Sequence, residues 1–213
     1  MGKKHGRKTV KIGPPASPED FAAEAAGKAI RFSQRDTLAH MLETAIELWF
    51  KDSDPLSIHL IGEAVYRCLD DLRAEMGIIR SKVGHDQFTL VYDYLRHAWA
   101  NRDAELLFPR GANRWLLFEA VNSFEKYFRN ISPTMRAFQI YFALHCFDRP
   151  PTSAELLEFL PEKVPVETFL NWSRAEFLDK ALPLFAGAGR PASSLWAFRK
   201  AHLPKSPREF ELP

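Results

Sequence analysis

Apolar residues recur every three to four positions along most of this chain, a spacing typical of amphipathic α-helices. The first such segment covers residues 33–50, and the second begins at Asp54-Pro55 and ends near residue 76. Aspartate followed by proline favours a helix start, because the carboxylate accepts hydrogen bonds from unpaired backbone N–H groups and proline suits the first turn. No segment keeps up the two-residue alternation of a half-buried strand. The sequence therefore predicts an all-α fold.

The same spacing predicts further helices toward the C-terminus. They cover residues 86–101, 112–130, 132–147, a short stretch at 152–160, and 166–185. We expect a bundle of about seven helices with a C-terminal helical extension and an irregular tail. Pro150 and Pro151 interrupt the helical pattern and mark the candidate subdomain boundary. The predicted parts are a flexible basic N-terminal arm at 1–32, a helical core at 33–148, and an extension and tail at 149–213 that pack on the core.

Charge and cysteine content limit the class of protein and its compartment. A net charge of +2 is too small for a surface that binds nucleic acid all over, which leaves a local basic patch. Cys68 and Cys146 lie in apolar helical patterns and form no Cys-x-x-Cys pair, so we expect buried, reduced thiols. Charged residues interrupt the apolar runs, and the N-terminus has no apolar signal core. We therefore predict a cytoplasmic protein without a membrane partner.

Two pairs of ionisable residues stand four positions apart on the second and third predicted helices. His59 precedes Glu63, and Asp93 precedes His97, so each pair shares one face of its helix. Antiparallel packing of the two helices brings both pairs to one edge of the interface, where a carboxylate can orient an imidazole for general acid or base chemistry. The same groups suit a divalent metal, and ordinary structural contacts are the plain alternative. We predict a polar network of His59, Glu63 and Asp93, with no metal.

The end of the third predicted helix carries a second constellation, which contains Arg96, His97 and Arg102. Guanidinium groups bind phosphate in a fork geometry and stabilise a phosphoryl transition state, while an imidazole can take the proton of an attacking hydroxyl. A metal-independent ribonuclease needs these groups, although the helix dipole attracts the same residues to a C-terminus. We take His97, Arg96 and Arg102 as the candidate catalytic residues and expect no cofactor.

Two short segments carry a family resemblance. Residues 54–59 read DPLSIH, and residues 92–98 read YDYLRHA. They resemble a group of bacterial all-helical proteins with an Asp-Pro-x-Ser-x-His helix start and an Asn-Phe-x-Lys-His-Ala helix. That group is similar in outline to the HEPN superfamily of helical ribonucleases and nucleotide-binding modules of toxin and phage-defence systems. The resemblance covers about residues 34–128 and implies an RNA-directed or nucleotide-directed function in a homodimer, whose subunits share a groove.

The match to this pattern is incomplete. Asp93, Tyr94 and Arg96 stand where the pattern has Asn, Phe and Lys. The arginine keeps the positive charge, whereas the aspartate changes the proton inventory beside His97. The Arg-x(4–6)-His signature of HEPN nucleases occurs at Arg35 and His40 and again at residues 80–85, about as often as chance allows. We therefore base the candidate site on Arg96 and His97.

Functions of different classes remain open. The first is a HEPN-like protein that binds or acts on RNA or nucleotides, in its enzymatic form a metal-independent ribonuclease of a defence or toxin system. The alternative is a non-enzymatic interaction or regulatory module that dimerises or meets a protein partner through aromatic surfaces, because the chain has 17 Phe and 5 Trp. A metal-dependent hydrolase that uses the two ionisable pairs is a third reading. Catalysis requires Arg96 and His97 to be accessible to solvent, whereas a structural role allows their burial.

Overall fold

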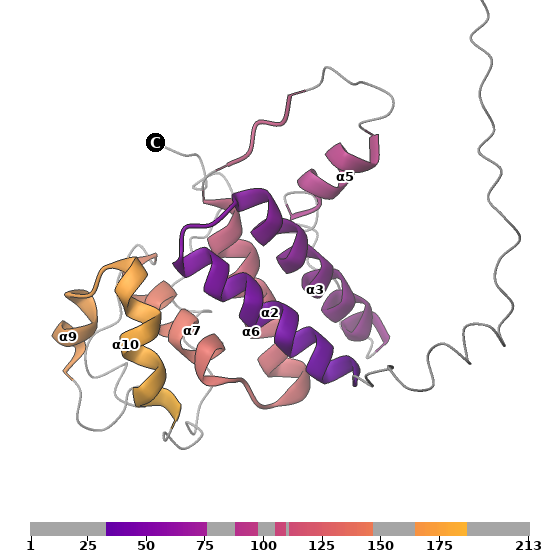
Figure 1. Cartoon of the computed structure of the whole chain (residues 1–213). Coiled ribbons are helices and arrows are strands. Elements are labelled where there is room, and N and C mark those ends of the chain that lie inside the picture. The colour runs from indigo at the N-terminus through magenta and orange to yellow at the C-terminus, as the bar shows by residue number, and fades with distance from the viewer. Residues whose placement is uncertain (1–32, 76–87, 98–104, 110, 147–164, 187–213) are drawn as a thin grey trace, which may run out of the picture. The chain divides into compact units, whose positions relative to one another are not determined.

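The computed structural model describes residues 33–75, 88–97, 105–109, 111–146 and 165–186. These residues form the helices α2 (Gln34–Phe50), α3 (Pro55–Glu75), α5 (Leu90–His97), α6 (Ala112–Phe128), α7 (Pro133–His145), α9 (Val166–Leu170) and α10 (Arg174–Ala186) (Figure 1). No strand occurs among them, which confirms the predicted all-α class. The predicted arm, the short helix at 152–160 and the irregular tail lie outside the described residues.

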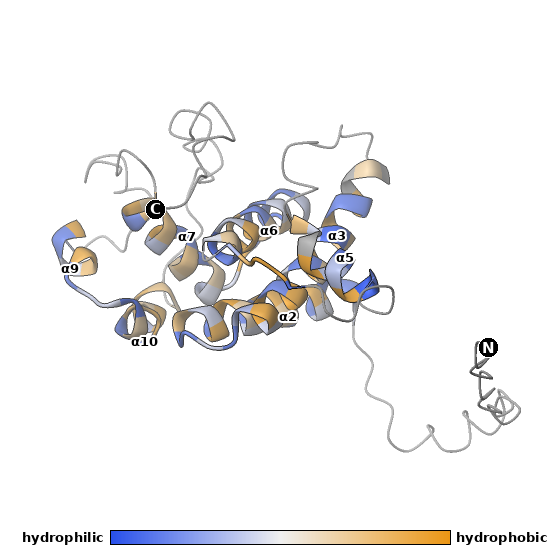
Figure 2. Ribbon diagram, turned by 90° about the horizontal axis from the view of Figure 1, so that it is seen from above, coloured by the Kyte–Doolittle hydropathy of each residue, from blue (hydrophilic) through white to orange (hydrophobic). Residues whose placement is uncertain are grey.

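Helices α2, α3, α6 and α7 pack together as the centre of the bundle. Helix α10 packs against α7 and α2, and α5 packs against α3 at the opposite end (Figure 1). Figure 2 shows hydrophobic and hydrophilic residues alternating along these helices, as the three-to-four-residue spacing predicts. Within the described ranges, no helix has the length and apolar character needed to cross a membrane.

Aromatic side chains make up much of the core. Phe138 of α7 is fully buried, and its ring meets those of Trp49 and Phe50 edge-to-face, with centroids 5.2 and 6.1 Å apart. Phe118 of α6 stacks on Phe142 of α7 at 4.0 Å. Edge-to-face and offset-stacked pairs are the arrangements that aromatic quadrupoles favour. Most of the described aromatic residues therefore fill the bundle interior rather than forming an external surface.

Helix starts follow ordinary capping chemistry, as the sequence predicts for Asp54. The Asp54 carboxylate accepts a 2.7 Å hydrogen bond from the Ser57 backbone N–H at the start of α3, and hydrogen bonding with the Ser57 side chain, followed by this backbone bond, lowers the pKa of Asp54. Ser132 caps α7, since its hydroxyl oxygen accepts from the Met135 N–H at 3.3 Å. Each capping residue thus pairs one backbone N–H of the first turn that would otherwise lack a partner within the helix.

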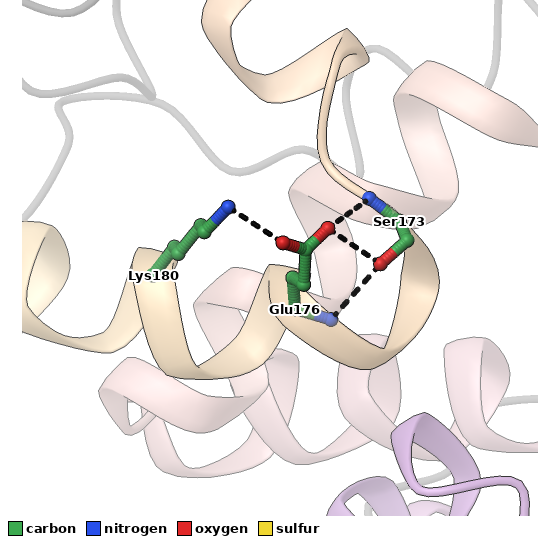
Figure 3. A network of polar contacts seen from close by, with 3 residues as sticks. All are labelled: Ser173, Glu176 and Lys180. Carbon is green, nitrogen blue, oxygen red and sulfur yellow. Dashed lines mark hydrogen bonds and ion pairs between the residues drawn. The ribbon is translucent and has the colours of Figure 1, made fainter.

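The single helix predicted over residues 166–185 is wrong, because the chain forms α9 and α10 with a break between them. Ser173 begins α10 with a capping box (Figure 3): its backbone N–H donates to the Glu176 carboxylate at 3.2 Å, and its hydroxyl oxygen accepts from the Glu176 N–H at 3.4 Å. Lys180 donates a further 2.9 Å bond to the other Glu176 oxygen. The Ser-x-x-Glu spacing therefore starts a new helix where apolar periodicity predicted continuity.

Two details of the predicted apolar stripes are also wrong. Cys68 is exposed on α3, although its spacing predicted burial, and Cys146 is half-buried. Helix α5 lies within the third predicted helix, and there helical spacing places Leu95 on the same face as Phe88 and Val91, yet Leu95 is 49% exposed. Helix α5 lies at the edge of the bundle and packs mainly on α3, so only its beginning reaches the interior. Phe88 and Val91 are buried there.

Candidate functional site

The exposed end of α5 carries three of the predicted site residues. Asp93, Arg96 and His97 are all exposed, and the last two occupy the final turn of the helix. Asp93 and His97 are four residues apart and share a helix face, as do Tyr92 and Arg96 on the adjacent face. The structure thus presents a guanidinium and an imidazole to solvent, while Arg102 lies outside the described residues.

An aromatic ring lies one helical turn before Arg96. Tyr92 is 42% exposed, and the guanidinium carbon of Arg67 from α3 lies 4.2 Å from the centre of its ring. This cation–π contact fixes the tyrosine against α3 while leaving part of the ring accessible. An exposed aromatic ring beside arginines is one means of binding unpaired nucleobases next to phosphate.

His59 occupies a different environment from the exposed residues of α5. Its side chain is 0% exposed, and its Nδ1 lies 2.9 Å from the side-chain oxygen of Asn113 on α6. Its Nε2 lies 3.1 Å from the backbone carbonyl oxygen of Phe88, just before α5. The Phe108 ring stands edge-to-face against the imidazole at 5.1 Å. His59 therefore links α3, α6 and the beginning of α5.

Glu63, one turn further along α3, is also buried. Its Oε1 accepts hydrogen bonds from Arg67 Nε at 2.8 Å and forms an ion pair with Arg67 Nη2 at 2.7 Å. Burial raises the pKa of the Glu63 carboxyl, and the positive charges of Arg67 and His59 oppose this shift. The backbone N–H of Tyr92 also lowers the pKa of Glu63, by a smaller amount. The Oε2 atom of Glu63 has no hydrogen bond of ordinary geometry within the described residues.

The two predicted pairs thus differ in their surroundings. His59 and Glu63 are buried and touch the beginning of α5, whereas Asp93 and His97 are exposed further along that helix. The described residues contain no group of three or more His, Cys, Asp or Glu side chains that can hold a metal ion, and all four of these residues are among them. The arrangement fits a buried polar support beneath an exposed basic surface better than one joint catalytic centre.

Sequence reasoning missed three participants, namely Asn113, Arg67 and the backbone carbonyl of Phe88. Arg67 was detectable, because it stands four residues after Glu63 in the orientation that favours a helical ion pair. Asn113 lies 54 residues from its partner His59, and no local spacing connects them. A backbone carbonyl leaves no trace in the side-chain sequence at all.

Comparisons of the chain with family models, curated proteins and solved structures gave no match.

Proposed function

We propose that this protein binds or acts on RNA or nucleotides through the exposed face of α5, with metal-independent ribonuclease chemistry as its enzymatic form. The observation that carries the proposal is that Arg96 and His97 are adjacent, exposed and one turn from the partly exposed Tyr92 ring. The arginine supplies charge for a phosphate, the histidine supplies a base, and the tyrosine supplies a surface for stacking.

The proposed reaction needs no metal. His97 takes the proton of the RNA 2′-hydroxyl, whose oxygen attacks the adjacent phosphorus while the bond to the 5′-oxygen of the next nucleotide breaks. Arg96 neutralises the charge that develops on the phosphate oxygens. The products are a 2′,3′-cyclic phosphate and a 5′-hydroxyl, and the leaving oxygen takes up a proton. The proposal includes a cytoplasmic homodimer in which both copies supply these groups.

The test is cleavage of a mixed RNA pool by the full-length protein in the presence of a chelator. We expect His97→Ala to lower the cleavage rate by about 100-fold or more, because a general base contributes at least that much. His40→Ala is the matched control, since His40 is also exposed on a helix but stands on α2. Loss of cleavage in both variants, or in neither, contradicts the assignment of His97 as the base.

The non-enzymatic alternative has a separate observation in its favour. Tyr92 and Leu95 are large exposed side chains on α5, and Leu107, in the described segment 105–109, is 87% exposed. Tyr92 is the one aromatic among the exposed large hydrophobic residues that the structure describes, so a broad aromatic surface finds little support there. Solution mass distinguishes the readings when combined with the RNA assay: a folded dimer without RNA cleavage or binding favours the interaction module.

A further inference from the structure

The hydrogen bonds of His59 constrain its protonation. Asn113 donates from its side-chain Nδ2 to the Pro55 carbonyl oxygen at 2.8 Å, and this bond fixes which end of the amide is nitrogen. The end that faces His59 Nδ1 is therefore an oxygen, 2.9 Å away. The atom that faces Nε2 is the Phe88 carbonyl oxygen, 3.1 Å away. Both ring nitrogens thus face acceptors.

A neutral imidazole has one N–H and one lone pair, so it can satisfy only one of these two oxygens. The doubly protonated ring donates to both. We infer that His59 is held as a buried imidazolium, and that His59 and Glu63 are positioning residues that fix the start of α5 against α3. The positioning role follows from the contacts, because His59 holds the Phe88 carbonyl and Glu63 faces the Tyr92 backbone N–H.

The groups around His59 are compatible with a buried positive charge. Glu63 lies one turn away on the same helix, and its charge is coupled to that of His59. Helix α6 presents the neutral Asn113, while the neighbouring Arg114 interacts with the Cys146 thiol instead. None of the charged residues of α2 is buried, and those of α5 are exposed. A buried cation is expensive unless neighbouring groups compensate it; His59 has an acceptor at each ring nitrogen, and the Glu63 carboxylate one turn away attracts its charge.

This arrangement determines where α5 places its exposed residues. The bond from His59 holds the Phe88 carbonyl just before α5, Glu63 faces the Tyr92 backbone N–H in the first turn, and Arg96 and His97 stand in the last turn. Helix α5 packs mainly on α3, and these polar contacts add a directional constraint to the burial of Phe88 and Val91. The effect of this placement on RNA binding rests on the proposed function, whereas the protonation of His59 and the ordering of α5 do not.

The first test is a histidine-selective ¹H–¹⁵N correlation spectrum of the full-length protein at neutral pH. We expect both ring nitrogens of His59 to show chemical shifts of protonated nitrogen, with the signals assigned by their loss in His59→Gln. The exposed His40 provides an internal comparison in the same spectrum. One unprotonated ring nitrogen at His59 under these conditions overturns the inference.

A pair of variants at residue 113 isolates the acceptor. Both Asn113→Asp and Asn113→Ala lose the donor to Pro55, but only the aspartate keeps an oxygen that can face Nδ1. We expect His59 to stay doubly protonated in Asn113→Asp and to lose its Nδ1 proton in Asn113→Ala. The same His59 spectrum in both variants contradicts the proposal, because the acceptor then has no influence on the ring.

Amide hydrogen exchange tests the positioning role. We expect His59→Gln to increase exchange in α5 by about tenfold or more, since a hydrogen bond to a charged group is lost, while α6 and α7 retain their protection. His40→Gln should leave all helices unchanged. Unaltered α5 exchange, or equal loosening of every helix, overturns the positioning role. If the protein proves not to bind RNA, these spectra and exchange rates still decide the inference.

Discussion

Helices α7 and α5 are attached to the bundle in different ways. Helix α7 is held by aromatic packing, with Phe138 against Trp49 and Phe50 of α2. Helix α5 is held at its start by the buried Phe88 and Val91 and, in addition, by polar contacts from His59 and Glu63 of α3. Hydrophobic packing is non-directional and insensitive to protonation, whereas the polar contacts depend on donor geometry and charge. The exposed candidate site stands on the helix whose attachment is more easily changed.

The largest expected effect concerns the aromatic packing that holds α7. Phe138→Ala should lower the free energy of unfolding by about 3–5 kcal/mol, because it removes a fully buried ring and leaves a cavity. Urea unfolding followed by far-UV circular dichroism measures this loss. Phe128→Ala, on a half-buried aromatic at the end of α6, is the control with a smaller expected loss. Equal losses for the two variants contradict the assignment of Phe138 to the centre of the core.

The polar contacts of Glu63 predict that the stability of the protein depends on pH. Burial raises the folded-state pKa of Glu63 above its ordinary value, so folding takes up a proton between the unfolded and folded pKa values. The contribution of Glu63 to stability is complete below the unfolded pKa, about 4.3, and is lost as the pH rises through the folded pKa. The stability of wild type relative to Glu63→Gln should therefore fall as the pH rises from about 4.

Chemical unfolding of both proteins across that pH range measures the difference. Glu167→Gln, at an exposed position on α9, serves as the control for removing a carboxylate. A relative stability of wild type that rises with pH contradicts the expected sign. It would mean that the charges of Arg67 and His59 outweigh the cost of burying Glu63.

A smaller effect is expected where Arg67 stacks on Tyr92. Tyr92→Leu removes a cation–π contact worth about 0.5–1 kcal/mol at an exposed position. We expect the loss to appear mainly as faster amide exchange in α5, because the contact joins α5 to α3. Tyr127→Leu on α6 is a comparison variant outside this contact. If α5 exchange is unchanged in Tyr92→Leu, then the stacked arginine does not help to hold the helix.

The smallest effect concerns the exposed capping box of α10. Hydrogen bonds from Ser173 and the ion pair with Lys180 lower the pKa of Glu176 to about 2. A depressed folded pKa gives a stabilisation that is present above the unfolded value, about 4.3, and is lost as the pH falls toward 2. Glu176→Gln should therefore reduce the acid-dependent part of the stability, as measured by unfolding between these pH values. An identical acid profile for wild type and Glu176→Gln contradicts this role.

Local signals predicted much of this fold because the relevant chemistry lies within a few residues. Asp54 and Ser132 cap the helices that follow them, as expected for their residue types and positions. A local signal also indicates the break before α10, namely the three-residue spacing of Ser173 and Glu176. Apolar periodicity masked it, because the hydrophobic residues on both sides keep a helix-like spacing.

The candidate site was only partly predictable. The four-residue spacing correctly placed His59 with Glu63 and Asp93 with His97 on shared helix faces, but spacing says nothing about which face is buried. Helix α5 lies at the bundle edge, so its later turns are exposed, whereas α3 is covered by α2 and α6. The partner of His59 on α6 is distant in sequence, and only the packed structure brings it into contact.

The most direct test of the proposed function is the binding of a short fluorescent single-stranded RNA, measured by anisotropy at fixed salt. Arg96→Gln removes one exposed positive charge from α5, and Arg35→Gln removes one exposed positive charge from α2. Phosphate contacts contribute strongly to RNA affinity, so we predict that Arg96→Gln weakens binding and reduces its salt dependence by about one charge, while Arg35→Gln retains wild-type binding. Equal affinity of wild type and Arg96→Gln would contradict the assignment of α5 as the RNA-binding surface.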